Sequence, residues 1–533
     1  MLPRMLGLLL LSCNGGPLGG GGDGGDTGLG ECDEGDLGCD GTVWVECNRW
    51  GNWKDLEECS DACSAELGCV TCKPGETRCA EGNSEICLDD GSGWTLSQEC
   101  DAEQGLTCED TTGTCDGACG AERRGDGLAG CDFWTIESRR VSEAADYSVV
   151  LVNPGGSAAN IVIDRGSERI DAFFIQPGAA AEIDVDYSSE PIDNDTDSMI
   201  VEGLSPRIRS DVPVLVWQAN NLWNTSASLD GTAVLPAHRL GTTAVAAAYT
   251  GYSDNCQSNV VVVATRDATS VTTTGQGKTM AGDGVDKSGN ASVSLDAGDA
   301  LWIFGDGDSD LSGTRVEASA PVAVLGSNDC AEVPVGDGYY DHLQAYSWPA
   351  SKLGTQYTAF PMRDDEEDRA QHIVWRVFGV GESATVTTEP SLLSGTVNPG
   401  EYLEVGTEEG FTLSATAPVM LVAYNSGDGG DFLGGEASMT VIPPDDVWAS
   451  ESTTYCPTDF DYCWIHAVSD QASVTVNGST LSLDQTVGAW NTGWVEASPG
   501  VVTIESDGVV WAYANNLETY YRASLLFPGS WGR

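Results

Sequence analysis

Two runs of alternating aspartates are the residues of this chain best suited, by type and spacing, to hold a metal ion. Calcium prefers several carboxylate oxygens on a short bending loop, and alternate aspartates can supply them. Leu311 stands where an EF-hand loop needs glycine, so a solvated acidic loop is the favoured interpretation and a calcium site is the alternative. We therefore predict no cofactor, with calcium as the one candidate. The two runs are Asp193, Asp195 and Asp197, and Asp306, Asp308 and Asp310 with Glu317.

Catalytic motifs are missing from the sequence. None of the four histidines lies in a metalloprotease pattern, and there is neither a Gly-x-Ser-x-Gly nucleophile elbow nor a phosphate-binding glycine loop. His342, in Asp-His-Leu, is interpreted as a structural hydrogen-bonding residue. We therefore predict that the chain is not an enzyme, with a secreted hydrolase as the least favoured function. The histidines are His238, His342, His372 and His466.

Disulfide formation is the chemistry that the sequence indicates most strongly. An exported segment that is rich in cysteine and poor in aliphatic residues needs covalent cross-links to fold, and residues 32–131 have this composition. Cys69 and Cys72 form a C-x2-C pair that could bind zinc, but no histidine precedes His238. The spacing leaves the connectivity open. We expect disulfides at Cys32, Cys39, Cys47, Cys59, Cys63, Cys69, Cys72, Cys79, Cys87, Cys100, Cys108, Cys115, Cys119, Cys131, Cys256, Cys330, Cys456 and Cys463.

A cysteine frame repeats within this segment, which predicts two small modules of one design. Both copies carry glycine shortly before the tryptophan. The matching positions are Cys32, Cys39, Cys47, Trp53 and Cys59 in the first copy, and Cys72, Cys79, Cys87, Trp94 and Cys100 in the second.

A second repeat, in residues 132–533, is a short apolar run that ends at asparagine. In each copy the asparagine lies seven residues after the opening residue. An apolar run opened by proline and closed by asparagine predicts a buried β-strand that leads into a turn. The four copies run from Pro213 to Asn220, Pro321 to Asn328, Pro418 to Asn425 and Gly508 to Asn515.

The region around these runs predicts an all-β fold with many short strands and glycine-rich turns. We expect four antiparallel repeats of about 90–110 residues in a ring-like or propeller-like arrangement, with tandem β-sandwiches as the alternative. The last copy ends just after Phe527-Pro528, and the strand expected next lies at the front, at 133–136. A last repeat that takes this strand from the first would close the ring and leave no exposed edge.

The four asparagines permit two interpretations. They can shape equivalent turns, or they can belong to equivalent loops that form one binding face together with nearby aromatic residues. The candidate ligand-binding residues are Trp217, Asn220, Trp223, Tyr339, Tyr340, Tyr424 and Tyr513.

The first residues predict export and anchoring. A basic start and a brief apolar run lead to Leu-Leu-Ser-Cys, which is typical of a bacterial lipoprotein signal (1–13) with Cys13 as the lipidated residue. An ordinary secretory signal is the alternative. Residues 14–31 are rich in glycine, so we expect a flexible tether.

The charge excludes several partners. With 82 acidic residues against 24 Lys and Arg, the formal net charge is −58. Nucleic acids and anionic membranes require clustered cations. We expect no nucleic-acid partner and membrane attachment only through the lipid, which places the chain at the outer membrane or cell surface.

The stretch from Val316 to Cys330 (VEASAPVAVLGSNDC), followed by Asp-His-Leu at 341–343, resembles the N-terminal domain of IgGFc-binding proteins. The junction Gly-Cys-Asp-Phe-Trp at 130–134 is also similar to bacterial members. Tyr340 stands where the family pattern has a cysteine, so the resemblance implies the disulfides Cys256–Cys330 and Cys456–Cys463. It also implies a secreted adhesive or binding role, without implying immunoglobulin as the ligand.

Together these observations favour a lipid-anchored surface binding protein or adhesin whose partner is a protein or a glycan. The alternative is a structural envelope or matrix component that associates with copies of itself.

Overall fold

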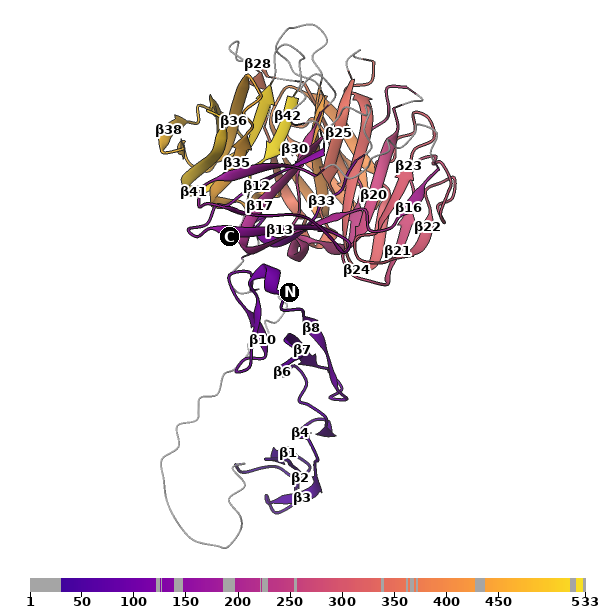
Figure 1. The fold of residues 1–533 in the computed structure, drawn as a ribbon, viewed down its shortest axis with the longest axis vertical. Helices are drawn as coiled ribbons and strands as arrows, with labels where there is room; N and C mark the ends of the chain where they lie inside the picture. The colour runs from indigo at the N-terminus through magenta and orange to yellow at the C-terminus, as the bar shows by residue number, and fades with distance from the viewer. Residues whose placement is uncertain are drawn as a thin grey trace, which may run out of the picture. The chain divides into compact units, whose positions relative to one another are not determined.

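The structure, a computed structural model, describes residues 30–120, 125, 127–138, 147–185, 197–220, 222, 229–253, 256–336, 340–360, 363–364, 369–370, 372–426, 437–517 and 524–530. The chain forms two compact units (Figure 1): a cysteine unit, of residues 1–99 and 108–114, and a β unit, of residues 100–107 and 115–533. No helix in these described ranges is long and apolar enough to cross a membrane. The predicted signal, Cys13 and nearly all of the tether lie outside the described residues.

The cysteine-rich modules have identical disulfide connectivity. Each has six cysteines, which pair first with third, second with fifth and fourth with sixth. The repeat therefore extends two cysteines beyond the four matched by eye in the sequence. The pairs are Cys32–Cys47, Cys39–Cys63 and Cys59–Cys69 in the first module, and Cys72–Cys87, Cys79–Cys108 and Cys100–Cys115 in the second.

The strands of the two modules also match. Three strands form a small sheet in each module, and two short strands follow. They are β1 (Leu37–Asp40), β2 (Val43–Cys47), β3 (Trp53–Glu58), β4 (Ala62–Ser64) and β5 (Gly68–Val70), then β6 (Thr77–Ala80), β7 (Asn83–Cys87), β8 (Trp94–Gln98), η1 (Ala102–Gln104), β9 (Thr107–Glu109) and β10 (Thr114–Asp116).

Four curled antiparallel sheets make up the β unit, which confirms the all-β prediction. The first contains β11 (Gly130–Trp134), β12 (Tyr147–Val152), β13 (Ala159–Arg165), β14 (Glu168–Ile175), β15 (Ala180–Asp184), β17 (Pro206–Asn220) and β18 (Gly231–Ala233). The second contains β16 (Met199–Val201), β19 (Gly241–Val245), β20 (Ser258–Ala264), β21 (Thr269–Thr274), β22 (Ala291–Leu295), β23 (Ala300–Phe304), β24 (Arg315–Glu332) and β25 (Tyr340–Tyr346).

The third and fourth sheets repeat this plan. The third contains β26 (Gly354–Ala359), β29 (Ile373–Gly379), β30 (Ala384–Glu389), β31 (Ser394–Val397), β32 (Tyr402–Thr407), β33 (Phe411–Asn425) and β34 (Ser438–Ile442). The fourth contains β35 (Ala449–Cys456), β36 (Tyr462–Ser469), β37 (Ser473–Val476), β38 (Ser479–Ser482), β39 (Gln485–Val487), β40 (Trp490–Glu496), β41 (Gly500–Leu517) and β42 (Ser524–Pro528). Short elements outside these sheets are η2 (Ala237–Arg239), η3 (Ala350–Lys352), η4 (Asp445–Val447), β27 (Arg363–Asp364) and β28 (Arg369–Ala370).

Each sheet is built around one long strand, labelled β17, β24, β33 and β41 in Figure 1. In β17, residues 206–210 pair with β13, whereas residues 215–220 pair with β12. Pro213 lies between these two ladders, where its missing N–H costs no ladder hydrogen bond. Pro321 and Pro418 occupy the same place in β24 and β33. The prolines thus mark the point where a strand passes between two halves of a curled sheet, rather than the start of a short strand as the sequence suggested.

The four sheets share one core. A single hydrophobic cluster includes buried residues of every sheet, from Leu128 to Phe527, and a smaller cluster lies within the second sheet. Among the inner strands, β18 contacts both β25 and β42, and β34 contacts the same two. This shared core contradicts the alternative of tandem sandwiches with independent cores.

The predicted exchange of a strand between the last and first repeats is wrong. β11, which contains Phe133, pairs with β17 in its own sheet, just as β19 pairs with β24 and β26 with β33. In each of these sheets, the long strand pairs with the strand that comes just before its own repeat in the chain. The first and fourth sheets instead meet through side chains, where the ring centroids of Trp217 and Phe527 are 6.0 Å apart.

Candidate functional site

The repeated asparagines are buried inside the long strands, so they form neither exposed turns nor a ligand face. The side-chain oxygen of Asn220 accepts hydrogen bonds from the backbone N–H of Asp230 (2.8 Å) and from Nε2 of Gln344 (3.2 Å). Asn328 donates to the carbonyl oxygen of Tyr249 and accepts from the N–H of Cys330, each at 2.9 Å. Asn220 and Asn328 thus satisfy backbone groups where strands end or bend.

The fourth repeat is shifted by one residue relative to the apolar phrase. Val419 of β33 pairs with Gly354, and the corresponding pair in the last sheet joins Val510 to Ala449. Counting from these pairs, Asn516 rather than Asn515 occupies the position of Asn425. Ladder register, and not the spacing from Gly508, decides which residues are equivalent.

Three of the predicted ligand-binding aromatics are buried and join neighbouring sheets. The indole N–H of Trp217 donates to the carbonyl oxygen of Pro528 at 2.8 Å, and the hydroxyl of Tyr424 donates to that of Ala248 at 2.9 Å. Tyr513 stacks on Phe360, with ring centroids 5.3 Å apart. The interpretation of Trp217, Tyr424 and Tyr513 as ligand contacts is therefore wrong, because packing between sheets excludes them from the surface. Trp223 and Tyr339 lie outside the described residues.

A buried hydrogen-bonded cluster joins the first three sheets. Oε1 of Gln218 accepts from the hydroxyls of Tyr147 (2.8 Å) and Tyr346 (2.9 Å), and its Nε2 donates to Oε1 of Gln344 at 2.9 Å. Three backbone N–H groups, those of Gly231, Gln344 and Met439, donate to the Asp230 carboxylate. Burial nevertheless raises the pKa of Asp230 well above its ordinary value. The hydrogen bonds of this cluster connect three inner strands, β18, β25 and β34.

His342 lies beside this cluster and is fully buried. Its Nε2 is 3.0 Å from the hydroxyl oxygen of Ser138. Burial lowers the pKa of His342 to about 3, so the imidazole is neutral at physiological pH. A neutral, fully buried imidazole supports the structural interpretation.

The second aspartate run has partners of its own. Oδ2 of Asp310 forms an ion pair with Nη1 of Arg376 at 3.0 Å, and the carboxylate of Glu317 on β24 pairs with Arg315 at 3.0 Å. No group of three or more metal-ligating side chains occurs in the described part of the chain, to which Asp306 and Asp308 also belong. Asp193 and Asp195 fall outside it.

Arg376 lies in a buried cage between the second and third sheets. Its Nη1 donates to the carbonyl oxygen of Ala248 (3.1 Å) and to the Ser312 hydroxyl (2.8 Å), and its Nε pairs with Glu404 at 2.8 Å. Tyrosine rings surround the guanidinium. Burial opposes the charge, but the phenols and carboxylates around it raise the pKa of Arg376 above its ordinary value. The ring centroids lie 4.2, 4.4 and 5.1 Å away for Tyr249, Tyr402 and Tyr424.

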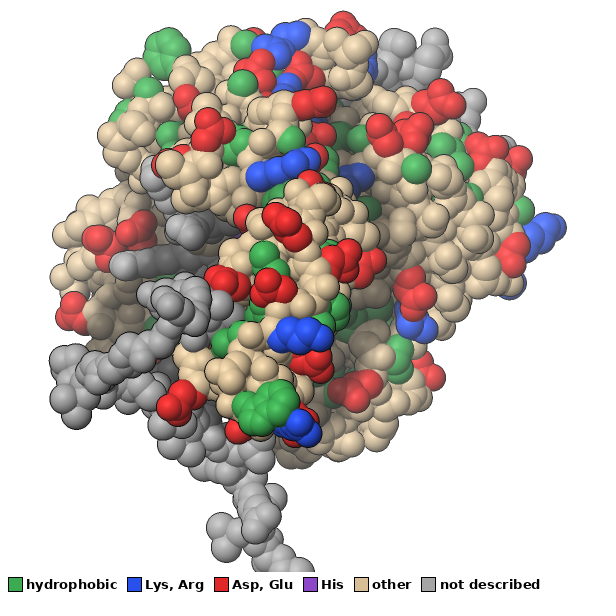
Figure 2. Space-filling view, turned by 90° about the horizontal axis from the view of Figure 1, so that it is seen from below, with side chains coloured by type: hydrophobic (Ala, Val, Ile, Leu, Met, Phe, Trp, Pro, Cys, Tyr) green, Lys and Arg blue, Asp and Glu red, His purple; other side chains and the backbone are tan. Residues whose placement is uncertain are grey.

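An exposed aromatic surface does exist at the β24–β25 hairpin, and we call Tyr252, Val335 and Tyr340 the tyrosine patch. The rings of Tyr252 and Tyr340 stack with centroids 4.7 Å apart and planes inclined by 17°. Tyr252 is 50% exposed, Tyr340 46% and Val335 65%. The described surface elsewhere carries many acidic side chains and few cations, as Figure 2 shows for one face.

A disulfide fixes the patch in place. Cys256 is bonded to Cys330, as the sequence resemblance implied, and the N–H of Tyr252 donates to the carbonyl oxygen of Cys330 at 3.0 Å. Glu332, two residues further along β24, pairs opposite Tyr340. Both tyrosines are therefore tied to β24, Tyr252 by a backbone hydrogen bond and Tyr340 by its ladder pair. Of the patch, the sequence identified only Tyr340; the implied Cys256–Cys330 pair was the signal that could have placed Tyr252 beside it.

The remaining disulfides of the β unit are Cys119–Cys131 and Cys456–Cys463. With the six pairs of the modules and Cys256–Cys330, the structure pairs each of the cysteines from Cys32 onward, and zinc has no ligands among them.

A comparison with protein-family models matches residues 230–515 to the family described as IgGFc binding protein. Searches of curated proteins and of solved structures found no match. The match spans more than half of the chain and runs from the last residues of the first repeat into β41, including the hairpin that carries Val335 and Tyr340. The chain therefore belongs to the IgGFc-binding protein family.

Proposed function

We propose that this chain is an exported, lipid-anchored binding protein of a bacterial cell surface, which recognises a protein or glycan partner through the tyrosine patch. The stacked pair Tyr252 and Tyr340 is the observation that carries the proposal. Family membership supports a protein partner. The nine disulfides support an oxidising compartment, since such bonds persist outside the cytosol.

The patch has the physical properties of a recognition surface. Tyrosine offers a large amphipathic contact at a low cost in conformational entropy. Here the cost is lower still, because Cys256–Cys330 and the backbone of β24 hold the rings before any ligand arrives. Tyrosine faces suit both apolar protein side chains and the C–H faces of sugars.

The test is binding of the labelled mature chain to cells of the producing organism and to foreign cells. We expect saturable binding, weakened about tenfold or more by Tyr340→Ala and by Tyr252→Ala, the range of interface hot spots. Tyr462→Ala is the matched control, because Tyr462 stacks on Trp464 elsewhere in the β unit, 6.3 Å between centroids.

Three results would overturn the proposal. Binding that is indifferent to both patch variants would place the ligand elsewhere, and absence of saturable binding with concentration-dependent self-association would indicate a structural coat component. Retention of Cys13→Ser protein in the membrane fraction would contradict the lipid anchor.

A further inference from the structure

The strand β14 is an open sheet edge. It pairs with β13 and forms the end of the first sheet, with no described strand on its other side. It has eight residues, whereas the corresponding edge strands β22, β31 and β38 have five, four and four. A long unpaired edge presents a row of free N–H and C=O groups to which another chain can pair. β14 is thus a longer edge than the corresponding strands of the other three sheets.

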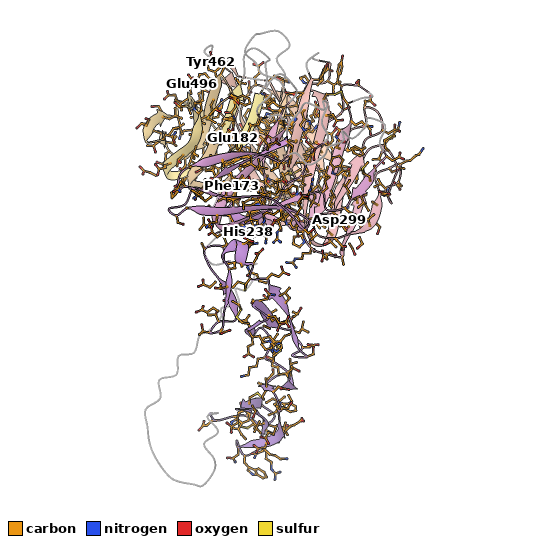
Figure 3. All side chains as sticks on the ribbon, in the orientation of Figure 1. Phe173, Glu182, His238, Asp299, Tyr462 and Glu496 are labelled. Carbon is orange, nitrogen blue, oxygen red and sulfur yellow. A yellow bond between two sulfur atoms is a disulfide. The ribbon has the colours of Figure 1, made fainter. Side chains whose placement is uncertain are left out.

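The side chains of β14 also differ from those of the other edges. Phe174 is 63% exposed, and Ala172, which the period of a strand places on the same side, is exposed as well. Phe173, labelled in Figure 3, faces the other way and packs against the core. On the shorter edges the exposed positions are hydroxyl residues: Ser292 and Ser294, Ser394 and Thr396, and Ser479, Thr480 and Ser482.

A hydrogen bond shows which backbone groups of β14 face outward. The Asp171 carboxylate accepts the N–H of Ala172 at 2.8 Å, so this N–H is not used by the ladder with β13. In an antiparallel pair, alternate residues direct both N–H and C=O away from the partner. Ala172 and Phe174 therefore present their backbone groups at the open edge. The strand contains neither proline nor lysine. Its one bulge leaves Ile170 unpaired, and residues 171–175 beyond it form an uninterrupted ladder with β13.

The charge of the chain indicates what kind of segment would pair with the β14 edge. The cations of this hairpin are already paired, Arg165 with Glu168, and Arg169 with Asp164 and with Glu103. Asp171 is exposed and forms no ion pair with any described residue, and the whole chain carries a net charge of −58. A second copy of this chain would bring the same excess of negative charge, whereas a cationic segment is attracted.

We propose that residues 171–175 of β14 dock an extended, cationic segment of a partner protein, which adds to the first sheet as a further strand. Main-chain hydrogen bonds to Phe174 and Ala172 supply the pairing, and the Ala172 N–H exchanges the Asp171 carboxylate for a carbonyl oxygen of the segment. An apolar side chain of the segment covers Phe174, and a Lys or Arg lies near Asp171. The site does not involve the tyrosine patch, which belongs to the second sheet.

Fluorescently labelled octapeptides test the proposal on the full chain by anisotropy. One probe alternates lysine with valine, a second alternates glutamate with valine, and a third is the lysine probe with N-methylated amides along one edge. We expect saturable, salt-sensitive binding of the lysine probe alone. Phe174→Ala should weaken it about tenfold. Ala172→Pro should abolish it, because proline removes the outward N–H yet is tolerated at a sheet edge.

The controls separate this site from the proposed function. Tyr340→Ala should leave peptide binding unchanged, and Phe174→Ala should leave cell binding unchanged; circular dichroism verifies that Ala172→Pro is folded. Equal binding of the glutamate probe would overturn the charge argument, and tight binding of the N-methylated probe or of the Ala172→Pro chain would overturn strand addition. A dimer in sedimentation that Ala172→Pro dissociates would make a second copy the occupant and overturn the cationic one.

Discussion

Replacing Arg376 with methionine tests how the second and third sheets are held together. Methionine keeps much of the buried volume but removes every hydrogen bond of the guanidinium. The side chain of Arg376 is 4% exposed, whereas those of its partners Asp310 and Glu404 are 21% and 43% exposed. Loss of the cation therefore leaves one mostly buried carboxylate, together with the Ser312 hydroxyl, without its strongest partner.

The expected loss of stability follows from these contacts. Removing one member of a buried ion pair costs about 3–5 kcal/mol. Water can reach both carboxylates in part, so the lower end applies, about 3 kcal/mol. Loss of the cation–π contacts adds about 0.5–1 kcal/mol. Unfolding entropy of about 2.1 cal/mol/K per residue over roughly 400 residues converts this sum to a fall in Tm of about 4 °C.

Thermal denaturation followed by circular dichroism measures the effect. Arg376→Lys keeps the charge but not the planar fork, so we expect about half of the loss. Tyr402→Phe keeps the ring over the guanidinium and removes a hydroxyl that is 3.4 Å from Asp310, so it should change Tm by under about 1 °C. A methionine variant as stable as the wild type, or a Tyr402→Phe variant as unstable as Arg376→Met, would refute the cage as the source of stability.

Three further outcomes are expected. Burial raises the pKa of Asp445 to about 6, above its value in the unfolded chain, so ionisation of this carboxyl lowers the stability of the fold as pH rises from about 4 to 6. In urea denaturation, Asp445→Asn should be about 2–3 kcal/mol more stable than wild type at pH 7 and equal to it near pH 3.5. Burial lowers the pKa of His342 to about 3, so as pH falls this imidazole takes up a proton in the unfolded chain before it does so in the folded chain. The free energy of unfolding should therefore fall by about 2 kcal/mol between pH 6.5 and 5. An NMR titration midpoint near 6.5 for this imidazole would contradict its burial. Replacing Cys256 and Cys330 with serine should cost about 4 kcal/mol in urea denaturation, because the bridge closes a separation of 74 residues; an unchanged midpoint would count against that loop-entropy argument.

Much of the fold is predictable because the repeats preserve local patterns. Pro213, Pro321 and Pro418 mark equivalent places, and apolar runs of fixed length after a proline predict buried strands. The sequence does not show that each apolar run is the second half of one long strand. That depends on which strands pair with the residues before and after the proline. In the fourth repeat glycine replaces proline, and the equivalent asparagine shifts by one residue because register is set by the partner strand.

The candidate site was less predictable because burial of an aromatic depends on distant segments. Nothing in the local sequence distinguishes Trp217, which bonds to Pro528, from Tyr340, which is exposed. Similarly, an alternating aspartate run suits calcium, yet Asp310 meets an arginine 66 residues away. These contacts arise from the packing of whole sheets, and only the implied Cys256–Cys330 pair carried comparable long-range information.

One hydrophobic core runs through all four sheets. The residues that match the family model are therefore not an independently folding fragment. Residues 230–515 omit nearly all of the first sheet and the final strand β42, including Gln218, whose partners Gln344 and Tyr346 would then face water. A protein trimmed to that span would expose apolar surface on two sides and aggregate. The four repeats must therefore be expressed together.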